Sequence, residues 1–214
     1  MKVLRLAFYF DLVCPWCWIA LRQLESAKAR LKETHPGIDV QVDFRSYPLL
    51  PELPAAGVDY HEFYSLRFRD PAALAHRRAQ VQRAGEGIVP PFGFDRIKLM
   101  PNTLLAHRLV DFARERGGAA ALLEALFSAY FNEGKDIGNR LSLLEIAGAS
   151  LPSTAGLPGW LEDEAARARL PHKARREAPS GLGGVPYLTA EGGENLSGVS
   201  SVDYLHYWLG AAAG

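Results

Sequence analysis

The apolar pattern at the start of the chain predicts a strand, a helix and a second strand in succession. Residues 3–10 form a nearly continuous apolar run, which is typical of a strand buried on both faces. Apolar residues then recur at every third or fourth position from Ile19 to Leu31, as on the buried face of an amphipathic helix. His35-Pro36-Gly37 ends that helix, and the alternation from Ile38 to Phe44 predicts the second strand.

The rest of the chain has the spacing of a helical block followed by a hairpin and a last helix. Prolines make residues 47–57 irregular, and Ser142 and Glu145 have the spacing of a capping box within the helical block. A hairpin over 185–198 precedes a terminal helix that Ser200 or Ser201 caps. The helical segments are 60–84, 105–113, 123–131, 160–165 and 173–178. The pattern therefore predicts an α/β fold in the order β-α-β, helices, β-β-α.

Composition places the chain among globular proteins with a substantial core, since 48% of its 214 residues are hydrophobic and 22% are charged. The formal net charge is zero, which removes the bulk electrostatic attraction typical of nucleic-acid or membrane-surface binders. No apolar stretch approaches the roughly 20 residues of a membrane span. Arg5 interrupts the N-terminal apolar run, which therefore fails as a secretory signal. We expect a cytoplasmic protein without nucleic-acid or membrane partners.

The two cysteines of the chain follow the first strand in the sequence Cys14-Pro15-Trp16-Cys17. Side chains three residues apart on a helix lie about 5 to 6 Å from one another. A disulfide can therefore form and break between them without backbone movement. Unpaired amides and the helix dipole favour the thiolate of Cys14 at the helix N-terminus. We predict that Cys14 is the nucleophile and Cys17 the resolving thiol.

Two alternatives compete with redox chemistry at this pair. The thiols could be buried and inert, or they could form half of a zinc site. No second Cys-x-x-Cys completes such a site, so we predict no metal, although the 6 histidines leave a mixed site open. Asp11 lies close to both cysteines in the sequence. A loop or capping role is the simpler interpretation of Asp11, and proton handling is the alternative.

Basic residues gather in two stretches of the helical block. One comprises Arg67, Arg69, Arg77, Arg78 and Arg83, and the other lies within residues 167–176. At zero net charge we interpret both as solvated helix faces. Binding of an acidic peptide or an anionic metabolite is the alternative.

An ordered set of motifs extends over nearly the whole chain. They are Asp11-x-x-Cys14-Pro15-Trp16-Cys17, Phe94-Asp95-Arg96-Ile97-Lys98, Asn102-Thr103-x-x-Ala106-His107-Arg108, Tyr130-Phe131-x-Glu133-Gly134-x-Asp136-Ile137-Gly138 and Gly184-Val185-Pro186. With these motifs the chain resembles the FrnE-type proteins of the DsbA family. The resemblance implies a thioredoxin-like domain over residues 1–55 and 180–214, interrupted by an inserted all-helical domain over 56–179. It also implies thiol-disulfide oxidoreductase or isomerase activity.

The resemblance further implies which residues form the site. The redox pair falls on Cys14 and Cys17. The family's cis-proline falls on Pro186, where Val185 would pair with an extended substrate strand. We expect Trp16, Val185, Pro186 and Asn102 to bind the substrate, although Asn102 also has the position of a helix cap. The expected partner is a protein or small-molecule thiol or disulfide, and a homodimer is the assembly left open.

The chain departs from the family pattern at Trp18, where tyrosine is usual, and at Ala20, where glycine is usual. The related kappa-class glutathione transferases and hydroxychromene-carboxylate isomerases have serine at the first position of the motif. Cys14 argues against their chemistry, but it leaves glutathione open as a co-substrate. No other cofactor is expected. A glutathione-dependent transferase or isomerase is therefore the alternative enzyme, and a binding module with incidental cysteines is the alternative without catalysis.

Overall fold

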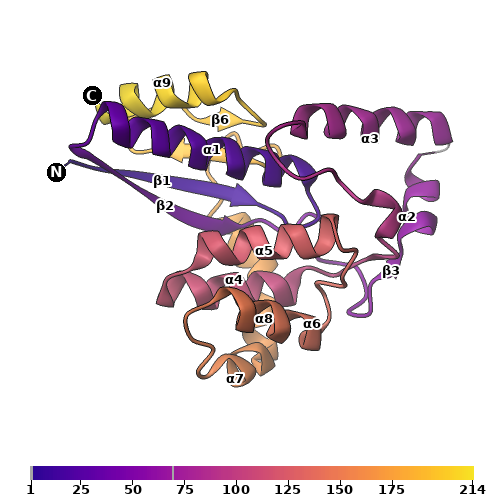
Figure 1. Cartoon of the computed structure of the whole chain (residues 1–214). Coiled ribbons are helices and arrows are strands. Elements are labelled where there is room, and N and C mark those ends of the chain that lie inside the picture. Colours follow the sequence, from indigo (N-terminus) through magenta and orange to yellow (C-terminus); the bar gives the residue numbers. More distant parts are fainter. Residues whose placement is uncertain (1, 69) are drawn as a thin grey trace.

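A four-stranded mixed sheet lies at the centre of the fold in a computed structural model of the chain, which describes residues 2–68 and 70–214 (Figure 1). The strand order is β2-β1-β5-β6. β1 pairs in parallel with β2 and antiparallel with β5, and β5 pairs antiparallel with β6. The strands are β1 (Lys2–Phe10), β2 (Ile38–Ser46), β5 (Tyr187–Ala190) and β6 (Leu196–Ser197). The two ends of the chain therefore build one sheet, which confirms the predicted α/β fold.

Helices α1 (Pro15–Thr34) and α9 (Val202–Ala213) pack against each other on one side of this sheet (Figure 1). The α1 helix begins after residues 11–14, which follow β1, and it ends before Pro36, as His35-Pro36-Gly37 predicts. Ser201 caps α9 by accepting a hydrogen bond from the Tyr204 amide at 3.2 Å. These two helices cover the apolar side chains of β1 that the sheet would otherwise expose.

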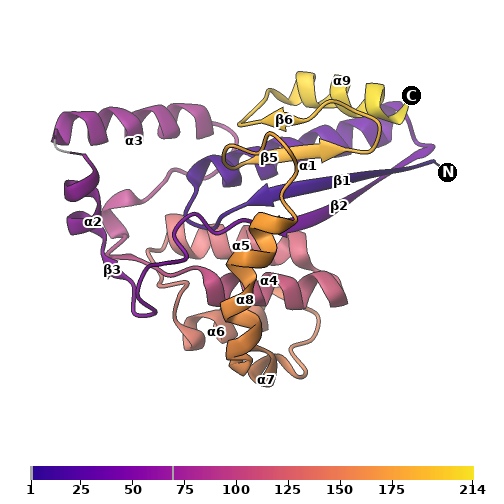
Figure 2. The same ribbon diagram turned by 180° about the vertical axis from the view of Figure 1, so that it is seen from behind.

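The segment between β2 and β5 is mainly helical. Its helices are α2 (Tyr60–Arg67), α3 (Pro71–Gly85), a 3-10 turn at Phe94–Arg96, α4 (Leu104–Arg116), α5 (Ala119–Phe131), α6 (Arg140–Ser150), α7 (Leu157–Glu162) and α8 (Glu164–Arg176). Two short strands, β3 (Val58–Asp59) and β4 (Leu99–Met100), form a separate antiparallel ladder. Figure 2 shows α8 leading from the helical layer back up towards β5. This path returns the chain to the sheet after the insertion.

Three helix boundaries differ from the sequence prediction. The prediction of a capping box that begins at Ser142 is wrong. Asn139 caps α6 instead, by accepting hydrogen bonds from the amides of Leu141 and Ser142. The predicted helix over 60–84 is two helices, since Asp70 caps a new one with Pro71 at its first position. Asp163 likewise divides the segment 160–165 between α7 and α8. Arg69 lies outside the described residues.

One contiguous apolar core joins the sheet to the insertion. Trp18 of α1 is fully buried and packs edge-on against Phe92, with ring centroids 5.5 Å apart. It also stacks on Phe127 and Phe131 of α5. The division of the chain into two domains at 55 and 180 stays a prediction. Within residues 2–68 and 70–214, no helix combines the length and apolar character that crossing a bilayer requires.

Candidate active site

The two thiols lie at the start of α1, where the chain leaves the central strand. Cys14 is the N-cap residue with an extended backbone, and Pro15 occupies the first helical position. Pro15 has no amide hydrogen to leave unpaired, so its place in the first turn carries no penalty. The Cys17 amide donates to the Cys14 carbonyl oxygen at 3.0 Å and closes that turn. Both cysteines are free thiols.

The two thiols differ in their surroundings. Cys14 retains 7% of its surface, whereas Cys17 is 0% exposed. Burial raises the pKa of the Cys17 thiol well above its ordinary value, and the neighbouring Cys14 adds to this effect. Cys17 therefore keeps its proton at neutral pH. The arrangement leaves Cys14 as the thiol that a partner can reach.

The chain between α8 and β5 returns to the thiols. The Val185 carbonyl oxygen accepts a hydrogen bond from Cys14 Sγ at 3.5 Å, and the Val185–Pro186 peptide bond is cis. Pro186 is buried, and its carbonyl oxygen accepts from the amide of Gly198, the residue after β6, at 2.9 Å. Residues far apart in the sequence thus meet at the start of α1.

Asp11 holds the loop beneath the thiols, which agrees with the loop role that the sequence favoured, although the sequence did not indicate its partners. Its side chain is fully buried and accepts hydrogen bonds on both oxygens. Oδ1 accepts from the Leu12 amide at 2.7 Å, from Thr103 Oγ1 at 3.0 Å and from His107 Nε2 at 3.1 Å. Oδ2 accepts from the Leu49 amide at 2.7 Å. This carboxylate therefore fastens the end of β1 to α4 and to the loop after β2.

Asn102, predicted to bind substrate, has its polar atoms engaged within the protein. Its Oδ1 accepts from the Leu104 amide at 3.0 Å, and its Nδ2 donates to the Leu53 carbonyl oxygen at 2.6 Å. These bonds attach the loop after β2 to the start of α4. Its part in substrate binding stays a prediction. Asn102 is not the N-cap of α4, because Thr103 has that position, but the Asn102 side chain accepts from the first amide of the helix.

A cavity of about 440 Å³ opens beside Cys14. Trp16 lines it, as do aromatic and basic side chains of α2 and α3, which the sequence did not connect with the thiols. Burial raises the pKa of Tyr60 and of Tyr64, so both hydroxyls stay protonated and can donate hydrogen bonds. The lining residues are Val13, Cys14, Pro15, Trp16, Leu49, Leu50, Glu52, Tyr60, Phe63, Tyr64, Arg67, Phe68, Leu74, Arg77, Arg78, Val81, Phe94 and Met100.

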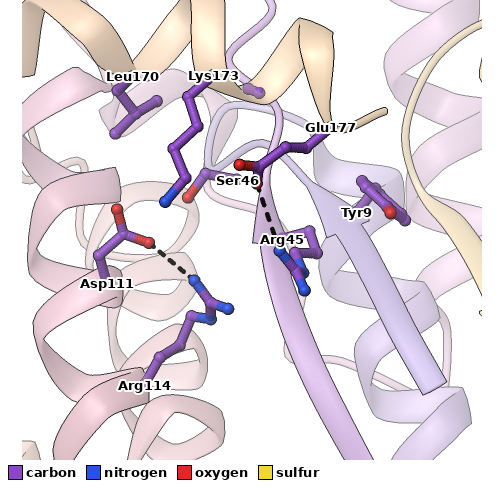
Figure 3. A pocket seen from close by; sticks show the side chains of 9 residues that line it. Tyr9, Arg45, Ser46, Asp111, Arg114, Leu170, Lys173 and Glu177 are labelled. Atoms are coloured by element: carbon purple, nitrogen blue, oxygen red, sulfur yellow. Dashed lines mark hydrogen bonds and ion pairs between the residues drawn. The ribbon is translucent and has the colours of Figure 1, made fainter. Parts of the chain in front are cut away.

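A second pocket, shown in Figure 3, is small and lies away from the thiols. It measures about 30 Å³ and lies between β2, α4 and α8. Arg45 pairs with Glu177 at 3.4 Å, and Arg114 pairs with Asp111 at 3.1 Å. The Arg45–Glu177 pair joins the end of α8 to β2, whereas the Arg114–Asp111 pair lies within α4. Neither cysteine lines the pocket. In the described part of the chain, no three His, Cys, Asp or Glu side chains gather as metal ligands would.

The strand order and the Cys-x-x-Cys pair at the first strand–helix junction define a thioredoxin-like protein. Residues 5–210 match the family model described as DSBA-like thioredoxin domain. The chain belongs to this family of thiol-disulfide oxidoreductases.

Three known proteins show how far the similarity extends. The uncharacterized protein YwbO of Bacillus subtilis is 26% identical over 170 residues, which cover 79% of this chain and 75% of YwbO. The structure of a probable DsbA oxidoreductase, SCO1869 of Streptomyces coelicolor, has a TM-score of 0.83 at 24% identity and covers 98% of this chain and 89% of its own. The cytosolic disulfide reductase DsbM of Pseudomonas aeruginosa, solved with GSH, has a TM-score of 0.62 at 22% identity, with coverage of 97% and 96%. The two structures share the fold with this chain.

Proposed function

We propose that this protein exchanges thiols and disulfides through Cys14 and Cys17. The observation that carries the proposal is the pairing of a thiol at a helix N-terminus, which keeps 7% of its surface exposed, with a fully buried thiol one turn further along. Cys14 is the N-cap residue of α1, so its thiol lies at the positive end of the helix dipole. The first attack by Cys14 and the second by Cys17 follow from that difference.

The reaction runs through one mixed disulfide. The Cys14 thiolate attacks one sulfur of a substrate disulfide, the substrate S–S bond breaks, and the second substrate sulfur leaves as a thiolate that takes up a proton. Cys17 then loses its proton and attacks the Cys14 sulfur. This step forms the Cys14–Cys17 disulfide and releases the other substrate thiol. Two electrons thus pass from the enzyme dithiol to the substrate disulfide, and the reverse sequence oxidises a substrate dithiol.

Val185 is the residue that we propose to bind the substrate backbone. Its carbonyl oxygen already accepts a hydrogen bond from Cys14 Sγ. A substrate segment that extends past Cys14 would pair with the backbone of Val185 in the manner of an added strand. Pro186 fixes the direction of that backbone, and Trp16 gives the cavity an apolar wall.

We also propose the cytoplasm as the compartment and glutathione as a thiol that returns the oxidised pair to the dithiol form. A protein of the same fold, DsbM, is described as a cytosolic disulfide reductase and was solved with GSH. A reducing compartment would keep the pair ready to reduce a substrate. Both protein disulfides and small-molecule disulfides are substrates under this proposal.

Reduction of insulin by dithiothreitol tests the proposal, with turbidity of the released B chain as the readout. The wild type should accelerate the reaction, whereas Cys14→Ser should abolish the acceleration. Cys17→Ala should accumulate a mixed disulfide on Cys14, visible by mass spectrometry. If the wild type neither reduces insulin nor refolds a scrambled disulfide substrate, and Cys14→Ser leaves transfer of glutathione to an electrophile unchanged, the exchange mechanism is wrong.

A further inference from the structure

We propose that the cavity beside Cys14 recognises a small organic disulfide that carries a carboxylate, and that Arg78 binds this carboxylate. The inference rests on the proposed function, because it names a substrate class for the same cavity. It also assigns a role to the basic stretch of α2 and α3, whose arginines the exchange chemistry at the thiols does not use.

Arg78 of α3 is held within the cavity wall rather than free in solvent. Its guanidinium carbon lies 5.4 Å from the centroid of the Tyr60 ring and 5.6 Å from that of Phe94. Its Nε and Nη2 atoms are buried and make no hydrogen bond of ordinary length and angle among the described residues. The guanidinium lies close enough to the Tyr60 hydroxyl to offset part of the burial-driven rise in the pKa of that group. Buried donors without an acceptor are costly, so a carboxylate in the cavity would supply the acceptor that Nε and Nη2 lack once the guanidinium turns towards it.

The ion pair recorded for Arg78 does not satisfy these donors. It joins Nη1 to Asp95 Oδ1 at 3.9 Å, and the Asp95 side chain is fully exposed at 100%. Water screens a pair of that length and exposure strongly. The planar guanidinium fork matches the two oxygens of a carboxylate, which would pair with Arg78 when its guanidinium turns towards the cavity.

The charge of the cavity wall favours an anion as well. Arg67 of α2 and Arg77 of α3 line the same cavity as Arg78 and are exposed at its rim. Glu52 supplies opposing negative charge among the described lining residues, and no ion pair joins it to these arginines. Three cations beside one carboxylate leave a local excess of positive charge, although the chain as a whole is neutral.

Size and polarity together define the ligand class. A cavity of about 440 Å³ has room for a small organic molecule. Its aromatic side chains would contact an apolar or aromatic portion of the ligand, while Arg78 binds the carboxylate and Cys14 meets the disulfide. A neutral disulfide of the same size would bind without the contribution from Arg78.

Two aromatic disulfides that differ in charge test this inference on the reduced full-length protein. Dithiobis(nitrobenzoate) carries carboxylates, and dithiodipyridine carries none. With either probe, Cys14 displaces the first thiol product and Cys17 displaces the second, so the protein ends as the Cys14–Cys17 disulfide. Stopped-flow absorbance gives the rate constant, which is divided by that of a simple alkyl thiol to remove the intrinsic reactivity of each probe.

Arg78→Gln should slow the reaction with the carboxylated probe about tenfold, because a charge-assisted hydrogen bond is lost. The same variant should leave the neutral probe within about twofold of the wild type. Arg78→Lys keeps the positive charge but loses the planar fork. Its rate with the carboxylated probe should lie between those of the wild type and Arg78→Gln. Arg83→Gln removes an equal charge from the exposed surface of α3 away from this cavity and should change neither rate.

Equal effects of Arg78→Gln on both probes would overturn the inference, because Arg78 would then shape the cavity or the thiol without binding the anion. An unchanged rate with the carboxylated probe would overturn it too. Failure of the proposed function has a different signature. In that case Cys14→Ser would react with the neutral probe as fast as the wild type does. Circular dichroism of each variant establishes that the comparison is made on folded protein.

Discussion

Replacement of Asp11 by alanine should destabilise the protein strongly, because this carboxylate is the acceptor for four donors. The Leu12 amide, Thr103 Oγ1 and His107 Nε2 are buried and would lose their acceptor. At about 1 kcal/mol or more for each buried unpaired donor, the loss should reach roughly 3 to 5 kcal/mol in the free energy of unfolding. The Leu49 amide is nearer to solvent, so water can replace its bond.

Urea unfolding followed by tryptophan fluorescence measures this loss. Asp163→Ala is the matched control, since exposed Asp163 caps α8 through the Ala166 amide at 2.8 Å and its removal should cost only about 1 kcal/mol. Asp11→Asn keeps one acceptor oxygen and should give an intermediate loss. If Asp11→Ala costs no more than Asp163→Ala, then Asp11 does not join β1 to α4 in the way that these hydrogen bonds indicate.

Three further changes test other parts of the structure. Trp18→Phe keeps a ring beside Phe131 but removes the indole N–H that donates to Glu124 at 3.0 Å, so chemical denaturation should show a loss of about 1 to 3 kcal/mol. Gly134→Ala should cost about 3 kcal/mol in the same assay, because Gly134 has a φ of +70° and an added Cβ would lie 2.3 Å from the Arg96 carbonyl oxygen; Gly148→Ala, with no atom within 4 Å, should lose nothing. Since burial raises the pKa of Cys17, the folded state retains a proton that the unfolded chain releases above about pH 8.5, so stability should fall as the pH rises beyond that value. The fall should be less steep in Cys17→Ala, and equal slopes would contradict the assignment.

Local patterns were sufficient to predict the elements at both ends of the chain. The apolar run of β1 and the periodicity of α1 depend on neighbouring residues, so the sequence displays them directly. The sequence also placed the cap of α9 at Ser200 or Ser201, and the cap is Ser201. The ladder of β3 and β4 was not predicted, because two residues per strand give no period to detect. The choice of Asn139 over Ser142 as a cap also escaped prediction, since both residue types are good caps.

The parts of the site that depend on distant residues were harder to predict. The thiol pair follows from its spacing, and the placement of Pro186 beside it came from the family resemblance. Thr103 and His107 bind Asp11 from 92 and 96 residues away, and no local pattern relates them. The cavity beside Cys14 was not predicted from the sequence for the same reason. The sequence pattern of its arginines is typical of solvated helix faces. Only the fold places α2 and α3 beside the start of α1.

The order in which the two thiols react tests the proposed mechanism most directly. The reduced protein is treated at neutral pH with less than one equivalent of iodoacetamide, and peptide mapping by mass spectrometry locates the label. Cys14 should be labelled first because it is the more exposed thiol, while Cys17 should react only after denaturation because burial keeps it protonated. Labelling of Cys17 before Cys14, or of both at the same rate, would contradict the assignment of Cys14 as the nucleophile.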